Sequence, residues 1–177
     1  NLYSYYSKSV MIGLLLEWKR REFQMKWIPK DIQTFIEARE YVDTVLVPLY
    51  GISFAEGISK SAASTEFISI ISQQVERQFK GRVLMLPGVT YCKDWTEEEK
   101  MKFILQWKST LETEKFPFIF FLTVDEYWKL YTDQLGNSLI LTPFIPLEDL
   151  EERYKKTVVE EEVSNILNKI IHKWRNI

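Results

Sequence analysis

Short, almost wholly apolar segments alternate along this chain with longer segments whose apolar residues recur at helical spacing. The clearest apolar segment, residues 44–49, contains no charged side chain. Such a strand is typical of a parallel sheet with helices on both faces, because both sides of the strand are then buried. The alternation therefore predicts an α/β fold in which helices cover a mainly parallel sheet.

Four apolar segments make the expected four-stranded sheet: residues 44–49, 82–86, 116–122 and 138–142. Four segments with helical spacing are expected to cover it: residues 29–41, 65–79, 96–114 and 124–134. Acidic residues three positions after Asp94, Thr96 and Thr123 predict capping boxes for the last two helices. In the closing segment, 147–177, the apolar residues change phase around 157–162, which predicts two helices or one kinked helix. We expect a three-layer, Rossmann-like or flavodoxin-like domain with a C-terminal helical segment.

The composition excludes several classes of function. The 23 basic and 25 acidic residues give a net charge of −2, without the basic excess of a nucleic-acid binder. The longest apolar run, residues 10–16, is too short to span a membrane, and the mostly charged run 17–22 directly after it does not fit a secretory signal. One cysteine allows no disulfide within the chain. We therefore expect a cytoplasmic protein with no nucleic-acid partner and no membrane span.

Residues 1–24 fit two descriptions. Residues 19–24 can be back-translated as AAA-AGG-AGG-GAA-TTT-CAA, which would place a purine-rich bacterial ribosome-binding sequence upstream of the Met25 codon. In that interpretation residues 1–24 are an upstream extension that is not translated. Alternatively they form an N-terminal amphipathic helix, because Val10, Leu14, Leu15 and Trp18 share a face. Residues 25–177 are expected to form a single α/β domain in either case.

Two stretches carry a resemblance to a known family: residues 25–32, from Met25 to Ile32, and residues 40–49, from Glu40 to Leu49. There the chain resembles the YpiF family, small uncharacterised proteins of Bacillus-type Gram-positive bacteria. The resemblance covers Met25 to the C-terminus and supports Met25 as the start. It implies lineage and localisation but no reaction, because the family is a domain of unknown function.

The loop after the first strand is the strongest candidate for a ligand site. Parallel sheets bind ligands at the carboxyl ends of their strands, where helix N-termini receive anions. This loop carries two glycines and a Lys-Ser pair, but the spacing departs from that of a phosphate loop. A plain connector is the alternative. If a ligand binds here, the residues expected to contact it are Ser53, Glu56, Lys60 and Ser61, with Ser53, Lys60 and Ser61 available to an anion.

Three further polar residues are expected at the same rim of the sheet: Cys92, Asp94 and Asp125. Cys92 could act as a nucleophile if a base lowered its pKa, and the only histidine is His172. Asp94 and Asp125 could serve as acid and base, although helix capping already explains both. No metal or cofactor is expected, because one histidine and one cysteine without paired carboxylates make no recognisable ligand set.

Aromatic residues exceed what a small core needs. Partly exposed, they would mark a protein-binding face, and buried, they would fill the space between helices and sheet. The residues in question are Trp27, Trp95, Trp107, Trp128, Trp174, Tyr127 and Tyr131. Since no catalytic motif is complete, the sequence favours a non-catalytic protein-interaction or regulatory domain that binds another protein or itself. The alternative is a phosphate-ligand binder or small hydrolase that uses the loop after the first strand.

Overall fold

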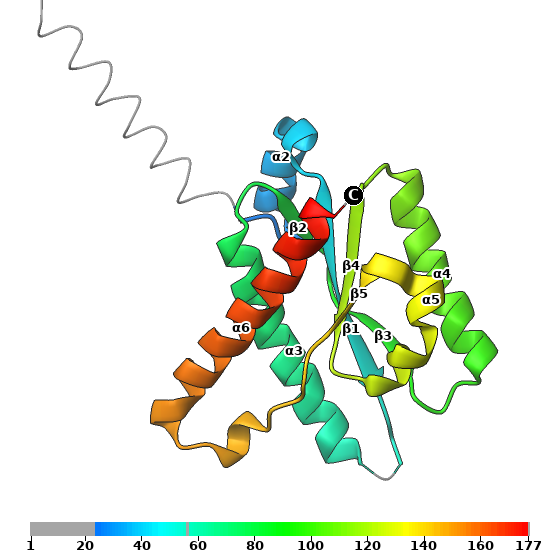
Figure 1. The fold of residues 1–177 in the computed structure, drawn as a ribbon, viewed down its shortest axis with the longest axis vertical. Coiled ribbons are helices and arrows are strands. Elements are labelled where there is room, and N and C mark those ends of the chain that lie inside the picture. The colour runs from blue at the N-terminus through cyan, green and yellow to red at the C-terminus, as the bar shows by residue number, and fades with distance from the viewer. Residues whose placement is uncertain (1–23, 56, 177) are drawn as a thin grey trace, which may run out of the picture.

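In the computed structural model, which describes residues 24–55 and 57–176, helices cover both faces of a central sheet (Figure 1). All ladders between its five strands are parallel. The strands are β1 (Thr44–Ile52), β2 (Val83–Met85), β3 (Val89–Cys92), β4 (Phe118–Thr123) and β5 (Leu139–Leu141). The predicted α/β fold class is therefore confirmed.

β1 is the centre of the sheet. Its first residues pair with β2 and its last with β3, while β4 lies on its other edge and β5 lies beyond β4. Counting β2 and β3 as one interrupted strand, the order 2-1-3-4 is that of a flavodoxin-like, doubly wound sheet. The expected second strand is split because Pro87 and Gly88 interrupt its ladder. In the described residues the sheet therefore has five strands instead of the predicted four, because residues 89–92, which belong to none of the predicted strands, form β3.

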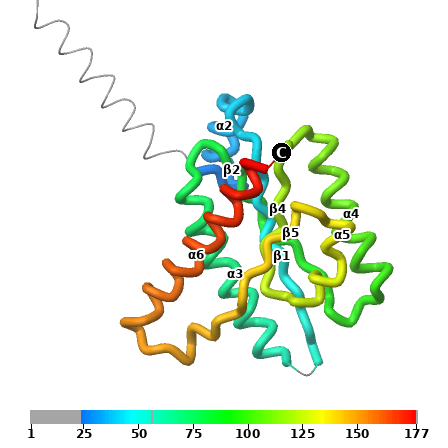
Figure 2. Tube along the Cα trace, in the orientation of Figure 1, coloured from blue at the N-terminus to red at the C-terminus, as the bar shows by residue number. Residues whose placement is uncertain are grey.

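The helices lie on the two faces of the sheet (Figure 2). The buried side chains between helices and sheet form two separate cores, one on each face. β1 contributes side chains to both cores: Val45 and Val47 lie in one core and Leu46 lies in the other. α3 (Ile58–Gln78) and α6 (Glu152–Arg175) cover one face, and α2 (Pro29–Glu37), α4 (Glu97–Thr113), the 3-10 helix η2 (Glu126–Tyr131) and α5 (Thr132–Leu135) pack on the other. Short 3-10 turns complete the chain: η1 (Arg39–Tyr41), η3 (Gly136–Ser138) and η4 (Leu147–Asp149). None of the helices in the described ranges is long and apolar enough to cross a membrane.

Several predicted helix boundaries change. α3 begins at Ile58, seven residues before the predicted start at residue 65, because Gly57 caps it with a positive φ of 89°. α6 is one continuous helix, so of the two predicted alternatives the one with two helices is wrong; Glu162, in the segment where the apolar residues change phase, is buried and accepts a hydrogen bond from Thr142. The helix predicted at 124–134 is mostly 3-10 and is capped by Asp125.

The start of α4 agrees with the sequence. Thr96 accepts a hydrogen bond from the Glu99 N–H at 3.2 Å, and the Glu99 carboxylate accepts from the Thr96 N–H at 2.8 Å. This is a complete capping box, and of the two candidates it uses Thr96 and not Asp94. Three glutamates in the first turn add favourable interactions with the helix dipole.

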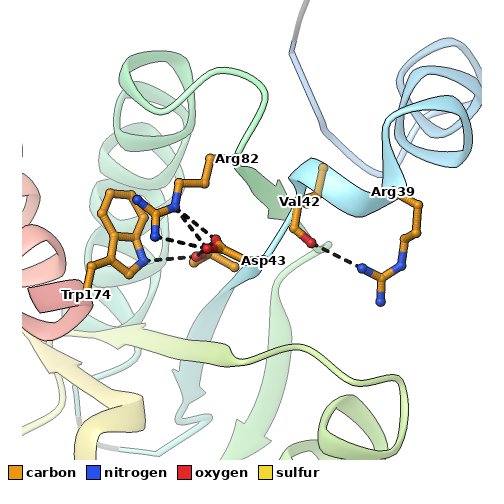
Figure 3. A network of polar contacts seen from close by, with 6 residues as sticks. Arg39, Val42, Asp43, Arg82 and Trp174 are labelled. Atoms are coloured by element: carbon orange, nitrogen blue, oxygen red, sulfur yellow. Dashed lines mark hydrogen bonds and ion pairs between the residues drawn. The ribbon is translucent and has the colours of Figure 1, made fainter. Parts of the chain in front are cut away.

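A polar network ties the end of α6 to the amino end of the sheet (Figure 3). The Arg82 guanidinium donates to both carboxylate oxygens of Asp43 at 2.9–3.2 Å and stacks 3.6 Å from the Trp174 ring centroid. Trp174 Nε1 donates to Thr44 Oγ1 at 3.0 Å. Because Asp43 and Thr44 open β1 and Arg82 precedes β2, the last turn of α6 is held against the start of two strands.

Candidate functional site

The loop after β1 is closed by a pair of hydrogen-bonded serines. Ser61, in the first turn of α3, donates through Oγ to the Gly51 carbonyl oxygen at 2.9 Å and accepts from the Ser53 N–H at 3.1 Å. Both serines are buried, and they line a hollow of about 530 Å³ whose wall does not include Lys60. Lys60 is exposed, and Glu56 lies outside the described residues. The structure thus brings Ser53 and Ser61 together in closing the loop, and Lys60 makes neither of these two hydrogen bonds.

The carboxyl ends of β1 and β4 meet where the strand order reverses, which is where doubly wound sheets bind ligands. Tyr91 of β3 occupies this place: its hydroxyl donates to Asp125 Oδ2, and a Cβ atom at Gly51 would stand 2.6 Å from its oxygen. Lys93 Nζ lies 3.4 Å from the same Asp125 oxygen. The remaining cavity is about 10 Å³, close to the smallest space that holds a water molecule. The protein's own side chains therefore fill this point.

Asp125 is occupied by structural bonds. Its Oδ1 accepts from the Tyr127 N–H at 3.1 Å and so caps η2, while Oδ2 binds Tyr91. Burial raises the pKa of the Tyr91 hydroxyl above its ordinary value of 10.0, and the hydrogen bond and charge of Asp125 raise it further. Tyr91, whose ring packs edge-on against Trp128 at 5.2 Å, is therefore a neutral donor at physiological pH. This cluster stabilises the rim and contains no free acid–base pair.

Cys92 and Asp94 lie near this rim but outside the cluster. Cys92 is half-buried at the end of β3, and Asp94 is exposed in the turn before α4. His172 lies near the end of α6, which contacts the opposite, amino end of the sheet through Trp174. The structure therefore keeps His172 away from Cys92. Within residues 24–55 and 57–176, no group of three or more His, Cys, Asp or Glu residues could hold a metal ion.

Sequence reasoning missed Tyr91 and Lys93 as members of the rim cluster. The break at Pro87 and Gly88 suggested that a loop comes after the second strand. The available signal was the period-two alternation over residues 89–92, in which Val89 and Tyr91 are buried and Thr90 is exposed. A strand at this position places Tyr91 directly beside Gly51 in the parallel ladder.

An apolar groove of about 610 Å³ lies between α2 and α4, over the link from β2 to β3. This volume is within the range of ligand and peptide-binding clefts. We call it the α2–α4 groove, and it is lined by Trp27, Phe35, Arg39, Leu84, Leu86, Pro87, Gly88, Val89, Thr90, Phe103, Trp107, Thr110, Leu111, Glu114 and Phe116. At its rim Trp27 is 55% exposed, so its indole is available to a binding partner.

The aromatic surface continues along α4. A second hollow of about 490 Å³ shares Phe103 and Trp107 with the α2–α4 groove and adds Trp95, which packs edge-on against Phe103 at 5.6 Å. Of the predicted aromatic surplus, Trp27, Trp95 and Trp107 thus line one partly exposed surface. In contrast, Trp128 is completely buried and fills the core.

Arg39 fixes one side of the α2–α4 groove. Its guanidinium carbon lies 4.4 Å from the Phe116 ring centroid and 5.2 Å from that of Phe35. It donates to the Val42 carbonyl oxygen at 3.1 Å (Figure 3) and to the Glu114 carbonyl oxygen at 2.7 Å. These bonds tie the segment after α2 to the end of α4. One wall of the groove is therefore formed by the Arg39 guanidinium together with the rings of Phe35 and Phe116.

The floor of the α2–α4 groove is an edge of the sheet. At β2 this edge is covered by a parallel bridge between Lys26 and Met85. The chain then leaves the sheet and enters α2 at Pro29. In the part of the chain that the structure describes, β3 pairs with β1 alone, so its outer edge faces the groove without a neighbouring strand.

Comparison with known proteins gives a family and no activity. A family model described as a protein of unknown function, DUF2487, matches residues 33–174. The uncharacterised protein YpiF of Bacillus subtilis (strain 168) is 33% identical over 153 residues, which cover 86% of this chain and all of the relative. No solved structure matches the chain. The protein therefore belongs to the DUF2487 family of proteins of unknown function and is similar to YpiF over most of its length.

Proposed function

We propose that this protein is a non-catalytic protein-interaction domain that binds an extended, apolar segment of another protein in the α2–α4 groove. The supporting observation is the groove itself: about 610 Å³ of apolar space, walled by aromatic side chains and continuous with a second aromatic hollow on α4. Aromatic side chains in partly desolvated pockets contribute most of the binding energy at protein interfaces. The filled switch point between β1 and β4 offers no comparable space.

The open edge of β3 favours an extended ligand over a helical one. A peptide that pairs with an exposed strand gains main-chain hydrogen bonds, and every second side chain then points to the same side. Here that side contains the groove, with Phe103 and Trp107 on its wall. The bridge at Lys26 already shows a segment pairing with this edge of the sheet at β2. A partner strand would continue that line along β3.

Selection from a displayed library of random peptides tests the proposal. We expect the wild-type protein to enrich peptides with apolar or aromatic residues at alternate positions. Trp27→Ser should weaken the binding of an enriched peptide at least tenfold, or about 1.4 kcal/mol, by removing an anchor at the groove rim. Since Trp27 is more than half exposed, the substitution should leave the fold intact, which circular dichroism and thermal unfolding would verify.

Leu130→Ser is the matched control, because Leu130 is 72% exposed and lies on η2 outside the groove. Its variant should bind the peptide as the wild type does. Equal loss in both variants, or selection of peptides without apolar residues, would contradict the proposal. If a second copy of this chain displaces the enriched peptide from the α2–α4 groove, the partner is another molecule of the same protein.

The competing proposal, a phosphate ligand or hydrolysis at the loop after β1, predicts a different result. A nucleotide would then raise the unfolding temperature, and the increase would disappear in Lys60→Ala. Lys60 is exposed and does not line the hollow formed by Ser53 and Ser61, which argues against this result. We also propose a cytoplasmic location, which agrees with a lone, unpaired cysteine.

A further inference from the structure

The most unusual buried group in this structure is the Glu76 carboxylate on α3. Glu76 is completely buried. Its Oε1 accepts from the Met25 N–H at 2.7 Å, while Oε2 has no hydrogen-bond partner among the described residues. A buried carboxylate oxygen without a donor is costly, and natural structures rarely keep one without a reason.

The side chain and the backbone of Met25 are both held in place by contacts with the rest of the fold. Its side chain is completely buried in the core, and its carbonyl oxygen accepts from the Met85 N–H at 2.8 Å. The next residue, Lys26, donates its N–H to Asp31 Oδ2 at 3.0 Å. Asp31 is also buried, so two carboxylates converge on the backbone of residues 25 and 26.

We propose that Glu76 forms a binding site for an α-ammonium group and that the polypeptide made in the cell begins at Met25, whose amino nitrogen pairs with this carboxylate. A backbone amide offers Glu76 one N–H and no charge. An α-ammonium at the same nitrogen offers three N–H donors and a positive charge, enough to satisfy Oε2 and neutralise the buried carboxylate. The purine-rich coding sequence expected just before Met25 is an independent reason to place the start there.

The electrostatic surroundings agree with this assignment. Burial raises the pKa of Glu76, whereas the Met25 N–H and the charges of Lys26 and Arg77 lower it, and the charge of Asp31 raises it. With an amide at Met25, burial is the largest influence on the pKa of Glu76, so the surroundings disfavour the ionised carboxylate. An ammonium at 2.7 Å would reverse this balance and lower the pKa of Glu76.

The first experiment is to determine the N-terminus of the protein purified from its source cells, by intact mass and N-terminal sequencing. We expect Met25 with a free amino group. A peptide that contains the Gln24–Met25 bond would overturn the proposal, as would a retained formyl group on Met25, because neither leaves an ammonium at this position.

A second experiment tests the ion pair directly. Every strand, helix and core residue that the structure describes lies at or after Met25, so a chain that starts at Met25 and the 177-residue chain both contain all of them. Glu76→Gln should reduce the folding equilibrium constant of the shorter chain at least tenfold, since it removes the partner of the ammonium. In the longer chain it should leave stability unchanged or increase it, since a buried charge is removed. The same effect in both chains would overturn the proposal.

Glu66→Gln, on the exposed side of α3, is the matched control and should affect both chains equally.

If Glu76→Gln prevents folding, the pH dependence of the unsubstituted chains replaces it. An ammonium paired with Glu76 has a pKa above its ordinary value of about 7.7–8.0. The stability it contributes is present below that range and is lost as the pH rises through the raised value. The other charged groups at the site are the same in both chains: Lys26, Asp31 and Arg77. A loss of stability at high pH in the shorter chain alone would therefore support the ion pair between Glu76 and the ammonium. Identical pH profiles of stability in the two chains would refute it.

Discussion

Gly51 and Gly88 lie where aromatic rings pass directly over the backbone of the sheet. A Cβ atom at Gly51 would stand 2.6 Å from the Tyr91 hydroxyl oxygen, and one at Gly88 would stand 1.9 Å from Cε2 of Tyr50. Neither glycine has a positive φ, so the requirement at each is for space and not for an unusual backbone. The two rings close the carboxyl edge of the sheet only because these residues lack side chains.

Gly88→Ala should lower the free energy of unfolding by about 1–3 kcal/mol, because Tyr50 must move away from the new methyl group. Removing the ring should relieve the strain. In a Tyr50→Ala background the same substitution is therefore expected to cost much less. A double-mutant cycle by urea denaturation measures this coupling. A cost that is independent of Tyr50 would show that the glycine is needed for some other reason.

Tyr91→Phe should cost about 2 kcal/mol at neutral pH, because it removes a buried hydrogen bond to a carboxylate. The folded-state pKa of Tyr91 is above its unfolded value of 10.0, so its contribution is complete below that pH and is lost as the pH rises further. The stability difference between wild type and variant should therefore shrink above a pH of about 10. Urea unfolding on both sides of that pH checks this, and a constant difference would contradict it.

At the scale of elements, α6 is fastened by its last turn. Trp174 contacts the guanidinium of Arg82, packs edge-on against Phe79 at 4.6 Å and donates to Thr44. The Arg82–Asp43 ion pair is partly exposed, at 41% and 32% of the side-chain surfaces, so it contributes modestly by itself. The indole is therefore the main attachment of α6 at the amino end of the sheet.

Trp174→Ala should cost about 3 kcal/mol, the lower end of the range for aromatic-to-alanine changes. Trp174→Phe keeps a ring beneath Arg82 and loses the bond to Thr44, so it should cost about 1 kcal/mol. Hydrogen exchange would show whether the amides in the last turns of α6 lose protection before those of β1. If α6 and β1 lose protection equally in Trp174→Ala, the helix is not held locally at this end.

The sequence predicts elements best where one short-range rule decides them. The capping box at Thr96 and Glu99 and the apolar run of β1 belong to this kind, and both are confirmed. The predicted start of α3 is too late because the loop is rich in glycine and serine; the actual start at Ile58 is supported by a bond across the loop, from the Ser61 hydroxyl to the Gly51 carbonyl oxygen. Helix starts that depend on contacts across the fold are invisible to local patterns.

The whole molecule explains why the candidate site was harder to predict than the fold. Trp27, Phe103 and Trp107 are distant in sequence and come together only because α2 and α4 pack on the same core. The sequence indicated a surplus of aromatic residues but not which of them share a surface. Likewise, the place of Met25 beside Glu76 depends on a contact between residues 51 positions apart.

The central position of β1 has a consequence for how the molecule is assembled. Thr44, its first residue, pairs with Val83 on one edge and with Phe118 on the other. During translation, this apolar central strand therefore emerges well before either neighbour exists, and parallel pairing between distant segments forms slowly. Until β4 has been synthesised, β1 has unpaired backbone groups on at least one edge and exposed apolar side chains. Such a strand is prone to aggregation, so the nascent chain is expected to need chaperones at this stage.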